Sequence, residues 1–244
     1  MSVKIASRTD IGLVRSSNQD SYAAGEMPGG VAWAVVCDGM GGANGGNVAS
    51  AAAVKMISEI ISSTYREGMS SNSIRIMLRS AIYSANVSIF DTAKSAPALA
   101  GMGTTAVAAV ISNGIMHIAH AGDSRAYLAG SGELKQITRD HSIVQSMVED
   151  GTISQSEARR HPRKNVITRA LGAQESIEVD YNEMPIESGQ MLLLCTDGLT
   201  NYMEPAQITG VLQDFSFEEY PDKLIERANQ NGGGDNITVV IIEA

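Results

Sequence analysis

Residues 101–138 form a succession of short apolar stretches, each separated from the next by residues that favour tight turns. The turn residues are Ser-Asn-Gly at 112–114, Gly-Asp-Ser at 122–124 and Gly-Ser-Gly at 130–132. Apolar runs at this spacing, joined by turns of this composition, are typical of consecutive β-hairpins. The segment therefore predicts an antiparallel meander.

Other segments of the chain predict further strands and three helices. Short apolar runs that predict strands occur at 2–7, 31–37, 190–195 and 237–242. Apolar residues at steps of three and four predict helices at 46–62, 70–92 and 217–229. These helices fall between groups of strands and do not alternate with single strands. That order favours a layered α+β fold over a parallel doubly wound sheet. No internal repeat or linker interrupts the chain, so we expect one domain over residues 1–244.

Composition and charge narrow the class of protein. The chain has 244 residues and a formal net charge of -9, which argues against a nucleic-acid partner. No apolar run is long enough to cross a membrane, and the N-terminal "MSVKIASRTD" lacks the apolar core of a signal peptide. Cys37 and Cys195 lie inside apolar runs without a histidine nearby, which favours buried reduced thiols over reactive ones. We therefore expect a cytoplasmic protein that does not bind a membrane.

Aspartate recurs where apolar strands end or begin. Asp38, Asp123 and Asp197 follow such strands, and Asp235 precedes one. Taken singly, each is explained by a plain turn, because Asp and Gly are common turn residues. If the strands are neighbours, however, the four carboxylates converge at one edge of the sheets, where they repel one another. A divalent cation removes that repulsion, and oxygen-only ligands favour magnesium or manganese over zinc.

Glycines follow Asp38 at positions 39, 41, 42 and 45. Without a side chain, a glycine lets a ligand approach its backbone carbonyl, which is one explanation for them. A loose match to the dinucleotide loop GxGxxxG is another, but such matches are weak evidence. Asp38 would face the pyrophosphate, and the hairpins do not supply the alternating strand–helix units of that fold. We prefer the metal interpretation.

Eight blocks of sequence carry a resemblance to a known family. They are "DIGLVRSSNQDSY", "VVCDGMGGANGG", "GMGTTAV", "HAGDSRAY", "TRDHS", "HPRKNVITRALG", "LLLCTDGL" and "GGGDNITVV". In this order and over nearly the whole length, they resemble the metal-dependent type-2C family of serine/threonine protein phosphatases, above all its small bacterial members. The resemblance implies a four-layer α-β-β-α sandwich of two antiparallel sheets flanked by helices. It also implies a flap at about 142–168 beside a metal centre.

The resemblance further implies a metal ligand at each strand-end aspartate. Asp38 would bridge two ions, the Gly39 carbonyl would bind one of them, and Asp197 and Asp235 would hold the other. Asp123 and Asp197 would hold a third, weaker ion. The cofactors implied are therefore two tightly bound Mn²⁺ or Mg²⁺ ions plus a weaker third.

Two further residues complete the implied catalytic site. Asp20 would orient water held by the metals, and Arg15 would bind the phosphate, since a planar guanidinium matches two phosphate oxygens. The reaction implied is hydrolysis of phosphoserine and phosphothreonine in proteins by a metal-activated water, without a covalent enzyme intermediate.

The chain departs from the family pattern at three positions. Met40 and Ala43 stand where some relatives carry a histidine, so the general acid is not assigned. Gln19 stands where some relatives carry an acidic residue, so we expect water in place of one direct ligand. An isolated histidine is more often structural than catalytic; among His117, His120, His141 and His161, we single out His141 in "TRDHS" as the candidate for a functional role.

We therefore expect a monomeric bacterial signalling phosphatase that acts on phosphorylated proteins and opposes a cognate serine/threonine kinase. One alternative is a dedicated regulatory phosphatase for a single partner protein, which sequence cannot separate because substrate choice lies in surface loops. Another alternative is an inactive binding module of the same fold, which the presence of Arg15 and all four metal carboxylates disfavours.

Overall fold

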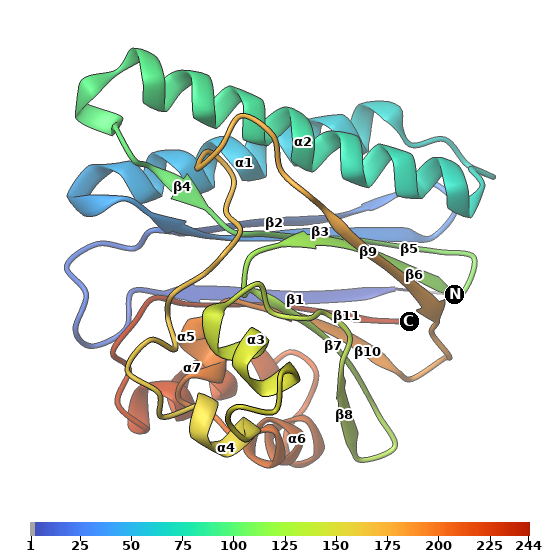
Figure 1. Cartoon of the computed structure of the whole chain (residues 1–244). Helices are drawn as coiled ribbons and strands as arrows, with labels where there is room; N and C mark the ends of the chain where they lie inside the picture. The colour runs from blue at the N-terminus through green and yellow to red at the C-terminus, as the bar shows by residue number, and fades with distance from the viewer. Residues whose placement is uncertain (1–2) are drawn as a thin grey trace.

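Two antiparallel β-sheets lie face to face, and helices cover the outer face of each sheet (Figure 1). The computed structural model describes residues 3–244, apart from the side chains of residues 42–44. The first sheet contains, in spatial order, β2 (Asp20–Met27), β3 (Val31–Met40), β5 (Ala106–Ser112), β6 (Ile115–Ala121) and β9 (Asp180–Pro185), with β4 (Gly103–Thr104) beside β3. The second contains β1 (Lys4–Asp10), β11 (Ile237–Glu243), β10 (Met191–Cys195), β7 (Arg125–Gly130) and β8 (Glu133–Gln136).

The helices form the two outer layers. Figure 1 shows α1 (Gly42–Thr64) and α2 (Ser71–Ser95) over the first sheet, followed in the chain by the short η1 (Pro97–Leu99). The opposite layer contains α5 (Asp197–Thr200), α6 (Pro205–Asp214) and α7 (Tyr220–Gln230), with α3 (Ile143–Glu149) and α4 (Gln155–Ala158) beside them. The expected four-layer α-β-β-α sandwich is confirmed.

Burial on both faces explains why the central strands are apolar almost without interruption. In β3, the odd-numbered residues 31–37 pack in the core beneath α1 and α2, and the even-numbered residues 32–36 pack between the sheets. In β10, Leu193 and Cys195 face the helices of the second sheet, and Leu192 and Leu194 face the other sheet. Side chains alternate between the two faces of a strand, so a strand covered on both sides needs apolar residues at every position.

The predicted elements match the structure with a few corrections. The strand expected at 2–7 is β1, which begins at Lys4 and continues to Asp10. The expected helices at 46–62, 70–92 and 217–229 are α1, α2 and α7. Neither β9 nor α6 was predicted from the pattern. No helix among residues 3–244 is long and apolar enough to span a membrane.

Both cysteines are free and fully buried. Burial raises the pKa of Cys195 to about 12 and raises that of Cys37 further still, with the nearby Asp20 and Asp38 carboxylates adding to the effect. A thiol with a raised pKa carries little of the reactive thiolate at neutral pH. The interpretation of these residues as core thiols agrees with this environment.

Candidate metal centre

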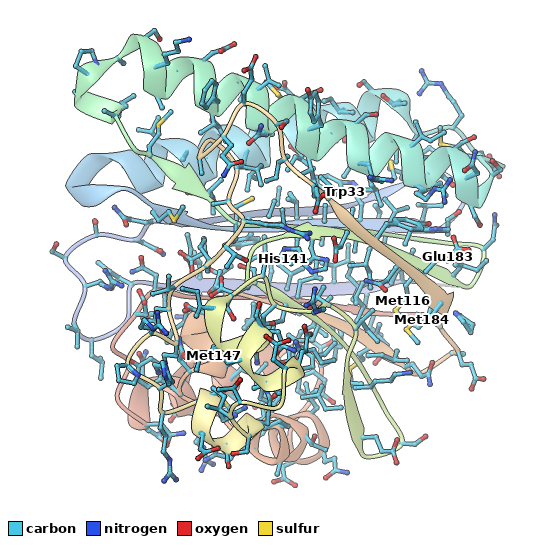
Figure 2. All side chains as sticks on the ribbon, in the orientation of Figure 1. Trp33, Met116, His141, Met147, Glu183 and Met184 are labelled. Carbon is cyan, nitrogen blue, oxygen red and sulfur yellow. The ribbon has the colours of Figure 1, made fainter. Side chains whose placement is uncertain are left out.

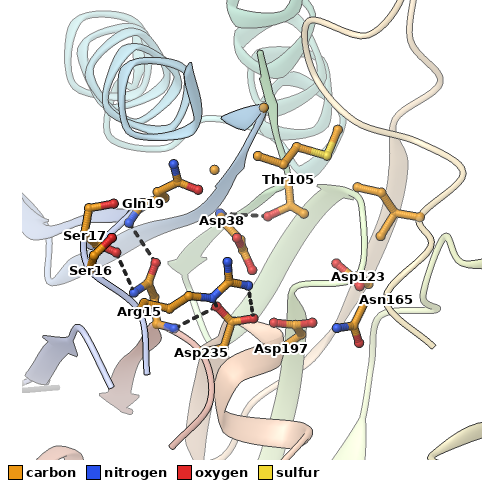
Figure 3. A pocket seen from close by; sticks show the side chains of 15 residues that line it. Arg15, Ser16, Ser17, Gln19, Asp38, Thr105, Asp123, Asn165, Asp197 and Asp235 are labelled. Carbon is orange, nitrogen blue, oxygen red and sulfur yellow. Dashed lines mark hydrogen bonds and ion pairs between the residues drawn. The ribbon is translucent and has the colours of Figure 1, made fainter. Parts of the chain in front are cut away.

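A cavity of about 410 Å³ lies where strands of both sheets end, and it is lined by Asp38, Asp123, Asp197 and Asp235 (Figure 3). Asp38 is near the end of β3, and Asp123 lies in the turn between β6 and β7. Asp197 begins α5 two residues after the end of β10 at Cys195, and Asp235 lies two residues before the start of β11 at Ile237. The four strand-end aspartates therefore converge, as the sequence predicts.

Burial and mutual repulsion make the ionised form of this cluster unfavourable. Desolvation raises the pKa of Asp38 well above its ordinary value, and the neighbouring charges of Asp20 and Asp197 raise it further. Desolvation likewise raises the pKa of Asp123, and it raises that of Asp197 to about 6. Buried carboxylates this close together need protons or a cation to neutralise them.

One carboxylate oxygen in the cluster fits the role of a cation ligand. Asp197 Oδ2 accepts a hydrogen bond from Asn201 Nδ2 at 2.8 Å. Asp197 Oδ1 is buried and has no hydrogen-bond partner among the described residues. Buried polar atoms without partners are rare, and a hard divalent cation satisfies an oxygen of this kind. The donor set, made of carboxylate and backbone oxygens, suits magnesium or manganese.

Asp20 is held next to Asp38 by two threonines, one within a strand of the other sheet and one directly after such a strand. Asp20 and Asp38 are paired residues in the β2–β3 ladder, but Asp20 is not among the residues that line the cavity. Asp20 Oδ2 accepts hydrogen bonds from Thr196 Oγ1 at 2.9 Å and Thr238 Oγ1 at 2.7 Å. Burial raises the pKa of Asp20 to about 7, although the two hydroxyls oppose the shift. Sequence reasoning missed both threonines, which are polar residues within or beside apolar strands.

The backbone at Asp38 is fixed by two adjacent threonines. The Asp38 N–H donates to Thr105 Oγ1 at 2.9 Å. The Asp38 carbonyl accepts from Thr104 Oγ1 at 2.8 Å and from the Thr105 N–H at 2.9 Å. Both threonines belong to the block "GMGTTAV", but the residue pattern gives them no role of their own. Their contacts prevent the end of β3 from moving relative to β4 and β5.

Gly39 lines the cavity, and it has a packing role that the sequence interpretation did not include. A Cβ at this position would overlap the carbonyl of Gly46 in α1 and crowd that of Gln19. The Gly39 N–H donates to the Gln19 carbonyl at 3.1 Å. Gly39 is therefore needed for the close approach of β3 to α1, whether or not its carbonyl binds a cation.

Arg15 lines the same cavity and forms a bidentate ion pair with Asp235 (Figure 3). The distances are 2.8 Å from Nε to Oδ1 and 2.9 Å from Nη2 to Oδ2. The loop that carries Arg15 is held by Asn236, whose Nδ2 donates to the Ser17 carbonyl at 3.0 Å and whose Oδ1 accepts from the Gln19 N–H at 2.8 Å. Arg15 is thus positioned at the cavity by a carboxylate that was itself predicted to bind metal.

The segment expected to form the flap contributes two residues that the sequence did not single out. Asn165 and Ile167 line the cavity. Figure 3 places Asn165 close to Asp123 and Asp197. Met40, at one of the positions without the relatives' histidine, also lines the cavity, whereas the Ala43 side chain lies outside the described residues.

His141 is not among the residues that line this cavity, and it lies near the centre of the molecule (Figure 2). His120, His141 and Asp180 each offer one potential ligand atom, and these three atoms lie within 4.8 Å of one another. This spacing could hold a metal ion. His141 Nδ1, however, accepts a hydrogen bond from the Gly122 N–H at 3.1 Å. A neutral imidazole has one such lone pair, so none remains for a metal. Arg169 Nη1 already neutralises Asp180 at 2.7 Å.

Comparisons with known proteins agree with this geometry. A family model described as "Protein phosphatase 2C" matches residues 14–238. The serine/threonine phosphatase stp of Listeria welshimeri is 40% identical over 237 residues, which are 97% of this chain and 94% of that protein. The crystal structure of the Mycobacterium tuberculosis serine/threonine phosphatase PstP/Ppp matches with a TM-score of 0.90 and 35% identity, covering 100% of this chain and 99% of that one. The PstP catalytic domain in complex with 2 manganese ions matches with a TM-score of 0.87 and 34% identity, covering 99% and 97%.

Proposed function

This chain belongs to the protein phosphatase 2C family of protein serine/threonine phosphatases, and we propose that it hydrolyses phosphoserine and phosphothreonine in proteins at the cavity described above. The observation that carries the proposal is the convergence of Asp38, Asp123, Asp197 and Asp235 from the ends of strands in both sheets. The buried Asp197 Oδ1, which has no hydrogen-bond partner among the described residues, supports a cation in this position.

We assign the metal ligands as follows. Asp38 would hold two ions, the Gly39 carbonyl would hold one of them, and Asp197 and Asp235 would hold the other. Asp123, together with Asp197, would hold a third and weaker ion. When bound, Mn²⁺ or Mg²⁺ supplies Lewis-acid stabilisation of phosphoryl oxygens and lowers the pKa of water to give a nucleophile. The complex of the related PstP domain with 2 manganese ions supports manganese as one suitable metal.

Arg15 binds the substrate phosphate. Its ion pair with Asp235 uses Nε and Nη2 and fixes the plane of the guanidinium. We assign Nη1, which this ion pair does not use, as the donor to a phosphate oxygen. Because the net charge of the chain is -9, a fixed local cation is needed to attract an anionic ester. Arg15 supplies it in addition to the metals.

Asp20 orients the attacking water by accepting one of its hydrogen bonds, and its own orientation is set by Thr196 and Thr238. We assign no side chain as the general acid, because Met40 cannot donate a proton. The leaving oxygen therefore takes its proton from water. We assign residues 142–168 as a flap over one catalytic domain of residues 1–244, and its Asn165 and Ile167 contact the substrate.

We place this reaction in bacterial signalling, where it opposes a serine/threonine kinase. The relatives named above are bacterial serine/threonine phosphatases, which supports this role. We propose a cytoplasmic monomer, and the two buried free thiols are consistent with a reducing compartment.

Hydrolysis of a phosphoserine peptide with and without chelator tests the proposal. Excess EDTA should abolish turnover, and manganese or magnesium should restore it. Asp38→Asn should lower turnover by several orders of magnitude, because this carboxylate would hold two ions. The matched control is Asp91→Asn, which changes an exposed aspartate on α2 and should leave turnover unchanged. Full turnover in excess EDTA would show that the proposed metal chemistry is wrong.

A further inference from the structure

We propose that His141 is a positioning residue that holds the turn at Gly122–Ser124, and through this turn Asp123, in the geometry that binds the third cation. The inference rests on the proposed function, because the position of Asp123 matters to catalysis only if Asp123 binds a cation. His141 is 3% exposed and reaches Asp123 only through the backbone of the preceding glycine.

Two hydrogen bonds join His141 to Gly122. The His141 N–H donates to the Gly122 carbonyl at 3.0 Å, and His141 Nδ1 accepts from the Gly122 N–H at 3.1 Å. Gly122 has a φ of 115°, a conformation that favours glycine, and a Cβ there would lie 2.6 Å from the Thr105 Cβ. His141 and Thr105 therefore enclose the backbone directly before Asp123 from two sides.

The contacts of the His141 ring fix its tautomer. A backbone N–H can only donate, so Nδ1 carries the lone pair and Nε2 carries the hydrogen. Nε2 lies 3.2 Å from Asp180 Oδ2 and 3.1 Å from Arg169 Nη1, which pairs with the same carboxylate at 2.7 Å. Arginine only donates, so the Nε2 hydrogen is directed at Asp180. The ring also stacks on His120 with centroids 4.7 Å apart and an interplanar angle of 7°. These partners prevent the ring from turning its Nδ1 away from Gly122.

The same turn is tied to the backbone at Asp38. Thr105 Oγ1 accepts from the Asp38 N–H at 2.9 Å and lies 2.7 Å from Ser124 Oγ. Ser124 is 1% exposed, and it directly follows Asp123. The residues on both sides of Asp123 are therefore held, one by His141 and the other by Thr105. This arrangement fixes Asp123 relative to Asp38.

His141 also lies at the base of the flap. Its carbonyl accepts from the Thr168 N–H at 2.7 Å. The next residue, Ser142, forms an isolated bridge with Ile167, which lines the cavity. One residue thus joins the Asp123 turn to both ends of the flap. Loosening His141 should therefore affect the third cation and the position of the flap together, and leave the ligands Asp38 and Asp235 in place.

Two variants of His141 separate the effect of its hydrogen bond from that of the bulk of the ring. Asparagine places its Oδ1 near the position of the imidazole Nδ1, so His141→Asn keeps an acceptor for the Gly122 N–H. Glutamine places its amide near the position of Nε2, so His141→Gln keeps a donor toward Asp180 and loses the acceptor. The matched control is His117→Gln. It removes a different buried histidine, which lies in β6 and whose Nδ1 is hydrogen-bonded to the Tyr181 hydroxyl at 2.7 Å.

The measurements are a calorimetric titration of the metal-free protein with Mn²⁺, the thermal unfolding midpoint, and kcat and KM on a phosphoserine peptide. In His141→Gln, the two tight ions should remain, and the weak third event should lose about ten- to a hundredfold in affinity, as for other residues that orient metal ligands. kcat should fall by a similar factor, with a smaller change in KM. His141→Asn should keep most of the wild-type affinity for the third ion and most of the wild-type kcat. His117→Gln should resemble the wild type in both quantities.

A third binding event and a kcat equal to wild type in His141→Gln would overturn the inference. Loss of all ions, or equal damage in His141→Asn and His141→Gln, would also overturn it, because this pattern indicates a general structural role. A different result would contradict the proposed function itself: unchanged turnover in excess EDTA would show that the reaction does not depend on a metal. An Asp123→Asn variant with an unchanged Mn²⁺ titration removes the third site, and the inference about His141 with it.

Discussion

Replacing Asp20 by asparagine should stabilise the metal-free protein at neutral pH, because it removes a buried carboxylate that is unfavourable when ionised. Burial raises the pKa of Asp20 from its ordinary value of 3.8 to about 7. In the unfolded chain this group loses its proton near the ordinary value. Between these two values the folded state binds more protons than the unfolded state, so the contribution of Asp20 to stability falls as the pH rises through this window.

The size of the effect follows from the shift. One pKa unit corresponds to about 1.4 kcal/mol, so an ionised Asp20 above pH 7 costs on the order of 4 kcal/mol of unfolding free energy. At pH 5 the cost is about 2 kcal/mol, because the folded state still holds the proton there. Asparagine has an oxygen that can accept from Thr196 and Thr238, so their hydrogen bonds are retained. For a chain of this size, each kcal/mol changes the unfolding midpoint by roughly 2–4 °C.

Thermal unfolding of wild type and Asp20→Asn in excess EDTA, at pH 5 and pH 8, is the assay. The midpoint of Asp20→Asn should exceed that of wild type by on the order of 10 °C at pH 8, and by less at pH 5. Saturating Mn²⁺ should remove the difference, because bound cations favour the ionised carboxylate. The exposed control Asp91→Asn should show no pH-dependent gain. A variant that is no more stable than wild type at pH 8 in EDTA would refute the reasoning.

Three other predictions follow from the site and the core. Arg15→Ala removes a charged phosphate contact worth about 1.5–3 kcal/mol and should lower kcat/KM by about ten- to a hundredfold, while a Mn²⁺ titration still finds two tight ions; loss of those ions would show that its assigned role is wrong. Gly12→Ala places a Cβ onto the Asp235 carbonyl at a φ of 77°, so it should lower both the unfolding midpoint and kcat, and wild-type values for both would contradict this packing argument. Cys37 and Cys195 are fully buried, so a thiol reagent should label neither in the native protein and both after denaturation; rapid labelling of the native protein would contradict the assignment of core thiols.

Apolar patterning predicted the central strands because these strands are buried on both faces, and such strands need an apolar residue at nearly every position. The runs at 31–37, 190–195 and 237–242 became β3, β10 and β11 with little change in their bounds. Strand β9 was missed because its residues are only partly buried and its sequence, "DYNEMP", is neither apolar nor regularly alternating. Helix α6 was missed although Glu204 and Gln207 form a capping box at its start, a signal that a search for helix starts would find.

In the candidate site, the residues marked by a local sequence pattern were predicted, and the contacts between distant parts of the chain were not. Asp38, Asp123, Asp197 and Asp235 were predictable because each lies at the end of a recognisable strand, and neighbouring strands end at one edge. The hydrogen bonds to Asp20 were not predictable, because they depend on how the second sheet lies over the first. Thr196 and Thr238 are 176 and 218 positions away from Asp20 in sequence, and no local pattern relates them.

The contacts of Asp20 also explain how metal binding and folding are linked. Asp20 belongs to the first sheet, whereas Thr238 belongs to β11 of the second sheet and Thr196 directly follows its strand β10, so this buried carboxylate joins the sheets beside the cavity. A buried carboxylate with a raised pKa lowers the stability of the metal-free protein, as active-site groups commonly do. A cation that binds only the folded state restores stability by RT ln(1 + [L]/Kd), about 2.7 kcal/mol at a hundredfold excess over Kd. The stabilisation by Mn²⁺, measured without any substrate, therefore reports directly on whether the two sheets hold the carboxylates in register.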